Sequence, residues 1–144
     1  MVSVSRTFLV DKPVSEVVAY LADFGNAEQW DPGTQACRRV GSDGPVQVGT
    51  TWHNVSKVLG RETELQYTLE VLEPGHITFV GRNDTATSTD DITVTAHPDG
   101  AEIVYDATID LHGLAKLGAP VVKVEFERLG NETVQGITSA IGAL

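Results

Sequence analysis

The side chains that could carry chemistry in this 144-residue chain are few, and most lie on segments that read as strands. Tyr67 and Tyr105 each carry a phenolic proton, and Asn54 offers an amide group for hydrogen bonding. Arg82 ends an apolar segment, where its guanidinium could bind a carboxylate or an enolate through two hydrogen bonds. Each residue also has a plainer role, because buried aromatic side chains usually fill a core and strand-end arginines usually form surface salt bridges.

The four histidines do not form a metal-binding or catalytic pattern. His53, His76, His97 and His112 show no HxH, HxxxH or HExxH spacing, and Cys37 is the sole cysteine. We therefore expect no metal site. No Ser-His-Asp constellation, phosphate-binding loop or dinucleotide fingerprint emerges either, so we expect no cofactor and assign no catalytic residue.

Acidic residues interrupt a segment that otherwise alternates as a strand. By the period of two, Asp90 shares a face with Ile92 and Val94, whereas Asp91 shares the opposite, threonine-rich face. A carboxylate in mid-strand is unfavourable unless it faces water or finds a partner. The threonine face is expected to meet water, although a polar pocket wall would show the same pattern.

Period-two alternation and turn residues predict a sheet of short-connected strands. Turn signals fall at residues 41–45, 59–60, 74–75, 83–84 and 97–100. Because every connection is short, we expect an antiparallel meander. The predicted strands span residues 4–10, 34–40, 50–58, 62–72, 76–82, 87–96 and 102–111.

Helical spacing flanks this strand-rich region on both sides. Pro13 suits a first helical turn, and a second short helix is expected to end at Trp30. Near the carboxyl end, a long amphipathic helix is expected to begin cleanly at Ala119, with either close approach to the sheet or a bend at Gly130 and Gly136. Its apolar positions are Leu114, Leu117, Val121, Val124, Leu129, Val134, Ile137 and Ile141.

Composition narrows the classes of partner and compartment. The formal net charge of -10 disfavours binding to nucleic acid, and no apolar run approaches the ~20 residues of a membrane helix. No signal-peptide pattern opens the chain. Cys37 cannot form an intrachain disulfide, and we expect it to be a buried structural residue in a reducing compartment, the cytoplasm.

The segment from Val4 to Gly33 resembles the amino-terminal signature of the START and pollen-allergen (SRPBCC) superfamily, in particular its bacterial polyketide cyclase/dehydrase-like branch. The motifs are a strand, x-Pro-x-x-x-Val, Leu-Ala-Asp-Phe and Trp-Asp-Pro-Gly. The resemblance implies one α+β domain over residues 1–144 with the helix-grip fold. In that fold a curved antiparallel sheet wraps around a long carboxy-terminal helix, with two short helices after the first strand.

The resemblance also implies a cavity between the sheet and the long helix, so inward strand residues become the expected ligand contacts. Tyr67 lies on the apolar face of its strand, and the face that contains Trp52 is taken as inward on the strand before it. An aromatic-lined cavity of this kind suits a flat hydrophobic ligand such as a polyketide, fatty acyl or steroid-like molecule. The expected ligand-binding residues are Trp52, Asn54, Tyr67, Phe79, Arg82 and Tyr105.

Three functions remain open at this point. The leading one is binding of a hydrophobic small molecule. The second is a polyketide cyclase or dehydratase, in which Tyr67, Tyr105, Asn54 or Arg82 supplies a proton or stabilises an enolate. The third is an interaction or stress-response module with a collapsed cavity. The chain could be a monomer or, through an exposed strand edge, a homodimer.

Overall fold

In the part of the chain that the structure describes, seven strands form one antiparallel sheet, and the order of most of them follows from the short turns in the sequence. The computed structural model describes residues 1–41 and 44–144. The strand order is β1-β7-β6-β5-β4-β3-β2, so β2 to β7 form the predicted meander and β1 returns to pair with β7. Part of the turn expected at residues 41–45 lies outside the described residues, at positions 42 and 43.

The boundaries of the elements confirm the predicted strands and helices to within a residue or two. The strands are β1 (Val2–Val10), β2 (Thr34–Val40), β3 (Thr51–Val58), β4 (Arg61–Glu73), β5 (His76–Arg82), β6 (Ala86–His97) and β7 (Gly100–Leu111). The helices are α1 (Val14–Ala22), the 3-10 helix η1 (Phe24–Asn26), α2 (Ala27–Trp30), the 3-10 helix η2 (Gly113–Gly118) and α3 (Ala119–Gly142).

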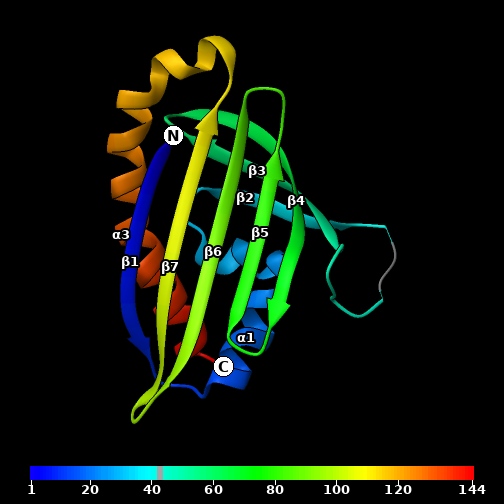
Figure 1. Ribbon diagram of the computed structural model, residues 1–144, viewed down its shortest axis with the longest axis vertical. Coiled ribbons are helices and arrows are strands. Elements are labelled where there is room, and N and C mark those ends of the chain that lie inside the picture. Colours follow the sequence, from blue (N-terminus) through cyan, green and yellow to red (C-terminus); the bar gives the residue numbers. More distant parts are fainter. Residues whose placement is uncertain (42–43) are drawn as a thin grey trace.

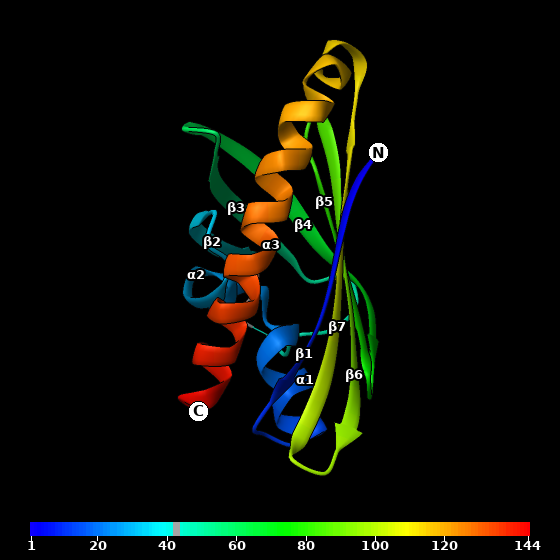
Figure 2. The same ribbon diagram turned by 90° about the vertical axis from the view of Figure 1, so that its left-hand side faces the viewer.

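All helices gather on one side of the sheet. Figure 1 views the sheet face-on with α3 behind it, and Figure 2 shows α3 running obliquely across that face with α1 and α2 beside its carboxyl half. Apolar side chains at alternate strand positions face these helices, and Val17 and Leu21 of α1 are fully buried against them. This arrangement confirms the helix-grip fold.

Glycines let α3 approach its neighbours closely. A Cβ atom on Gly136 would lie 2.2 Å from the carbonyl oxygen of Trp30, and one on Gly130 would lie 3.0 Å from Cγ2 of Val4. A real side chain at position 136 would therefore collide with backbone. The expected close approach to the sheet is found at Gly130, which lies against β1, whereas Gly136 approaches α2 instead.

The predicted apolar face of the carboxy-terminal segment is wrong in its first half. Leu114, Leu117 and Val124 are at least 73% exposed, whereas Val122 and Phe126 face the sheet. The spacing of apolar residues does not indicate which face of the helix is buried here, because residues 121–126 carry apolar side chains on both sides of the helix. The second half follows the prediction, since Ile137 and Ile141 are fully buried.

Candidate functional site

A pocket of about 450 Å³ lies between the inner face of the sheet and the first half of α3. The sheet supplies one apolar wall and α3 supplies the other, because both elements turn their hydrophobic faces toward each other there. The carboxyl half of α3 packs directly on the core instead, so the space ends near Trp30 and Thr133. The apolar lining includes Val4, Leu65, Ala107, Ile109, Val122, Phe126 and Leu129.

Polar side chains from three strands meet on the sheet wall of this pocket. Asp90 on β6 accepts a hydrogen bond of 2.5 Å at Oδ1 from the hydroxyl of Tyr105 on β7. Ser88 and Tyr67 also line this region, and all four side chains are at least 91% buried. Asp90 pairs with Ala107 in the β6–β7 register, and Tyr105 lies two residues from Ala107 on the same face of β7, diagonally across from Asp90. A buried acid and a buried phenol therefore lie side by side on the wall of a mostly apolar space.

Burial shifts the pKa values of Asp90, Tyr67 and Tyr105. Loss of water around the carboxyl raises the pKa of Asp90 to about 7, partly offset by the hydrogen bond from Tyr105, while the charge of Asp31 adds to the rise. The pKa values of Tyr67 and Tyr105 are raised well above their usual 10.0, first by burial and then by the nearby Asp90 charge. Asp90 is thus the group of this set that changes charge near neutral pH.

Asp31 lies on another part of the lining and has a different environment. Its oxygens accept hydrogen bonds from the backbone N–H of Gly33 (3.3 Å) and from the hydroxyl of Thr34 (2.7 Å). Thr34 in turn accepts from the amide of Asn54, and Asn54 accepts from the hydroxyl of Ser56. Burial raises the pKa of Asp31, and these two donors oppose that rise. This chain of hydrogen bonds fixes the turn after α2.

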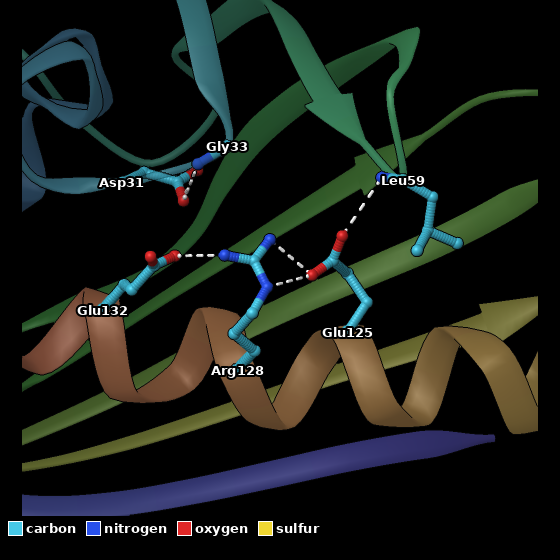
Figure 3. Close-up of polar contacts among 6 residues, drawn as sticks. All are labelled: Asp31, Gly33, Leu59, Glu125, Arg128 and Glu132. Carbon is cyan, nitrogen blue, oxygen red and sulfur yellow. Dashed lines mark hydrogen bonds and ion pairs between the residues drawn. The ribbon is translucent and has the colours of Figure 1, made fainter.

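At the border of the pocket, the turn of the β3–β4 hairpin contacts α3. Leu59 and Gly60 both have positive φ, 53° and 77°, as a two-residue hairpin of the I′ type requires. The Leu59 N–H donates to the carboxylate of Glu125 at 3.2 Å, and Arg128 pairs with both Glu125 and Glu132. Figure 3 shows this row of side chains along α3, with Asp31 and Gly33 across from it.

The six residues predicted to bind a ligand occupy three kinds of position. Tyr67 and Tyr105 lie on the pocket wall. Trp52 and Phe79 are fully buried beneath it, where both pack around Phe24 with ring centroids 6.2 and 4.5 Å away. Asn54 is buried within the hydrogen-bond chain already described, behind Ser56.

Arg82 lies on the opposite face of the sheet from the pocket. Its neighbour Gly81 faces inward, where the ring of Tyr67 packs so closely that a Cβ at Gly81 would meet it at 2.6 Å. Strand alternation therefore turns Arg82 outward, and it forms an ion pair of 3.4 Å with Glu70. The structure thus brings Tyr67 and Tyr105 together on one wall and leaves Arg82 away from them.

Sequence reasoning missed part of the polar lining. Alternation placed Asp90 on the inward face with Ile92, but it did not indicate that Tyr105 would reach it from the next strand. Thr133 and Phe126 of α3 also line the pocket, and only the register of α3 on the sheet reveals this. The indole N–H of Trp30, another lining residue, is buried without a hydrogen-bond partner among the described residues.

Within residues 1–41 and 44–144, no group of three or more His, Cys, Asp or Glu side chains is arranged to hold a metal ion. No helix in the same part of the chain is both long and apolar enough to cross a membrane.

Comparison with known protein families gives a match over nearly the whole chain. The family model described as polyketide cyclase / dehydrase and lipid transport matches residues 1–140. A search of curated proteins finds no significant match.

Solved structures share the fold at low sequence identity. TTHA0849 from Thermus thermophilus is 14% identical with a TM-score of 0.78, over 99% of this chain and 97% of that one. The ZhuI aromatase/cyclase from a Streptomyces species is 12% identical with a TM-score of 0.79, over 96% and 92%. A START superfamily protein from Mycobacterium smegmatis is 16% identical with a TM-score of 0.71, over 98% and 94%.

At these identities the structural likeness concerns the fold, and the family assignment comes from the sequence match. Both agree with the strand, helix and Trp-Asp-Pro-Gly signature at the amino end. The chain belongs to the polyketide cyclase / dehydrase and lipid transport family.

Proposed function

We propose that this protein binds a hydrophobic small molecule, polyketide-like or lipid-like, in the pocket between the sheet and α3. The observation that carries the proposal is an apolar space of about 450 Å³ with its buried polar groups gathered mainly on the sheet wall. Pockets for small molecules usually measure ~300–1,000 Å³ and combine an apolar lining with a few polar groups that orient the ligand. Tyr67 and Tyr105 are the proposed ligand contacts among the six predicted residues.

The other two predicted aromatic residues, Trp52 and Phe79, support the wall and do not touch the ligand. Trp52 and Phe79 are fully buried around Phe24, and the ring of Tyr67 lies 4.4 Å from that of Phe24. Replacing either buried ring would leave a void and shift Tyr67. The presence of open volume beside this packed cluster favours binding over the alternative of a collapsed-cavity interaction module.

A filled pocket provides the first test. Ala107 lines the pocket from β7, whereas its neighbour Thr108 turns to the outer face of the same strand. We expect Ala107→Leu to abolish or strongly weaken binding of the neutral fluorescent probe N-phenylnaphthylamine, because the added side chain takes up ligand volume. Thr108→Leu serves as the matched control and should bind the probe as the unmodified protein does.

The same proteins should be analysed by native mass spectrometry for compounds that copurify. A hydrophobic compound present in the unmodified protein and in Thr108→Leu, but absent from Ala107→Leu, would support the proposal and identify a ligand. Equal probe binding by Ala107→Leu and Thr108→Leu would contradict it, since binding would then take place elsewhere.

A second function, that of a cyclase or dehydratase, is favoured by one observation, the Asp90–Tyr105 pair on the pocket wall. A general base works best when its pKa lies near the operating pH, and that of Asp90 is raised to about 7. In this function the Asp90 carboxylate removes a proton from the carbon next to a ligand carbonyl group, and the pocket restrains the ligand's conformation.

Proton exchange tests the enzymatic function without knowledge of the natural substrate. The hydrophobic ketone α-tetralone in deuterated buffer should gain deuterium at its α-carbon faster with the protein than without it, and Asp90→Asn should remove the acceleration. If binding of α-tetralone is measurable but exchange runs at the uncatalysed rate, the enzymatic function is refuted and the binding function stands.

A further inference from the structure

The charges that line the pocket are unevenly placed. The charged lining residues are Asp90, Asp31 and Arg61. Asp90 is 7% exposed and Asp31 is partly buried, whereas Arg61 is exposed at the start of β4, beside the hairpin turn. Among the described residues, no basic side chain forms an ion pair with either lining carboxyl group, Asp90 or Asp31.

Asp90 has unused capacity to accept hydrogen bonds. Its Oδ1 accepts from Tyr105, but its Oδ2 receives no hydrogen bond from the described residues. Asp31 differs, because both of its oxygens accept from groups in its own turn. A carboxylate that is this deeply buried and only half satisfied is costly unless a partner of opposite charge or a further donor arrives.

We propose that the ligand of this pocket is a hydrophobic amine, whose ammonium group pairs with Asp90 while its apolar part lies between the sheet and α3. The inference rests on the binding function proposed above and adds the chemical class of the ligand. Tyr105 acts as a positioning residue, since its hydroxyl holds Oδ1 and leaves Oδ2 free toward the ammonium. Leu65, Ala107 and Phe126 supply the apolar surface.

An ammonium group suits this part of the pocket better than the head groups of other amphiphiles. Asp90 loses its water when the protein folds. The desolvation cost of this half of the ion pair therefore arises on folding and does not weaken ligand binding. A hydroxyl group would supply one hydrogen bond but no compensating charge. A carboxylate would meet two carboxyl groups of like charge, and it would instead lie at the rim near Arg61 with its tail inward.

The proposal gives a signed dependence on pH. The titratable groups that face Asp90 are Tyr105 on β7, Tyr67 on β4 and Asp31 after α2, while the lining residues of α3 contribute none. Both tyrosines stay neutral at pH 6–8 because their pKa values are raised well above 10.0. An alkylammonium remains charged there, since amines of this kind have pKa values of about 10.

Amine binding should therefore follow the ionised fraction of Asp90. With the pKa of Asp90 at about 7, that fraction changes about tenfold between pH 8 and pH 6. We expect the affinity for the amine to be about tenfold higher at pH 8 than at pH 6. Binding of an uncharged ligand should change little over the same range.

The test compares three ligands with the same tail, decylamine, decanol and decanoate, by displacement of N-phenylnaphthylamine at both pH values. At pH 8 we expect decylamine to bind at least about tenfold more tightly than decanol, a difference of about one charge-assisted contact. Asp90→Asn, which keeps the shape of the side chain, should remove the preference and its pH dependence. Asp106→Asn, the matched control, removes a carboxylate next to Tyr105 on the outer face of β7 and should keep both.

Other outcomes separate this inference from the binding function itself. Equal affinity for decylamine and decanol, with the probe bound, would overturn the amine proposal and leave the binding function intact. A preference for decanoate that is lost in Arg61→Gln would overturn it and assign the opposite ligand orientation. If neither the probe nor any of the three ligands binds, the binding function fails and the inference fails with it.

Discussion

Asp90 has nearly equal free energies in its two protonation states near neutral pH, because burial opposes its charge. Between the ordinary carboxyl pKa of 3.8 and the folded pKa of about 7, the folded protein holds a proton that the unfolded chain has released. The folded state therefore binds more protons in this window, and the free energy of unfolding falls as pH rises from about 4 to about 7. Above pH 7 this contribution is constant.

Asp90→Asn should consequently stabilise the ligand-free protein at pH 8 and have little effect at pH 4. The shift in pKa corresponds to on the order of 4 kcal/mol at most. Urea unfolding at the two pH values measures the change. Asp91→Asn on the outer face is a useful control, because it removes the carboxylate charge that pairs with His76 and should destabilise. An equal effect of Asp90→Asn at both pH values would contradict the burial argument.

Cys37 is a buried thiol, as expected for a lone cysteine with no base beside it in the sequence. Burial raises its pKa to about 12, and the charges of Glu28, Asp31 and Asp23 act in the same direction. The reactive thiolate is therefore scarce at pH 8. We expect iodoacetamide to label the folded protein very slowly and the urea-unfolded protein at the rate of a free cysteine, as measured by mass spectrometry. Rapid labelling under native conditions would show that the strand opens.

For single residues, the sequence predicted the sheet face on which a side chain lies better than it predicted which residues that side chain contacts. Strand alternation placed Tyr67, Tyr105 and Asp90 on inward faces, and the structure has all three on the pocket wall. Alternation does not specify the register, that is, which residue of the neighbouring strand lies opposite a given residue. The Asp90–Tyr105 contact, which depends on the β6–β7 register, could not be predicted for that reason.

The position of helix α3 depends on the absence of a Cβ atom at Gly136. Gly136→Ala would set a Cβ atom 2.2 Å from the carbonyl oxygen of Trp30, and backbone there cannot move without displacing α2. Alanine is favoured over glycine in a helix interior by about 1 kcal/mol, so the clash must exceed that gain. We expect a net loss of more than about 2 kcal/mol in the free energy of unfolding.

Gly130→Ala is the matched control on the same helix. Its nearest contact would be a side-chain methyl group of Val4 at 3.0 Å, which can shift by a few tenths of an ångström. The helical gain and the small strain should nearly cancel, so we expect a change within about 1 kcal/mol. Similar losses in the two variants by urea unfolding would refute the distinction between backbone and side-chain neighbours.

The elements themselves were predictable because their signals are local. Turn residues marked the ends of the strands, and Pro120 and Gly118 marked the start of α3 near Ala119. The orientation of the first half of α3 was not predictable, since Val121 and Val124 compete with Val122 and Phe126 for the buried face. The pocket depends on that orientation, so its α3 wall could not be derived from spacing.

In the whole molecule, β1 forms one edge of the sheet. It pairs with β7, which follows about a hundred residues later, and Val4 lies opposite Ala107. It also joins α3, because Arg6 donates to Asn131 and to Glu127. Removal of residues 1–10 should therefore expose the edge of β7 and one wall of the pocket. We expect the shortened protein to lose cooperative thermal unfolding and to aggregate. A monomeric, cooperatively folded product in size-exclusion and calorimetric measurements would contradict this role of β1.

The helix-grip architecture was recognisable from the first 33 residues, because the sequence carries its signature motifs there. The volume of the pocket was not, since it is the space left after every side chain has packed. A sequence lists which side chains are apolar, but it does not show where the two packed layers fail to meet.

The contact between Glu125 and the Leu59 N–H has a consequence for the rates of ligand exchange. The hairpin and α3 both border the pocket, and this hydrogen bond of 3.2 Å joins them. Because Glu125 and the Leu59 N–H are not among the ligand contacts proposed above, we expect the same bond when the pocket is filled. A contact that is the same in both states does not alter the equilibrium between them. It must, however, be broken if the two elements separate to let a molecule pass. Glu125→Ala, which removes the acceptor, is therefore expected to accelerate entry and release of N-phenylnaphthylamine by a similar factor in stopped-flow measurements, shortening its residence time at an unchanged Kd.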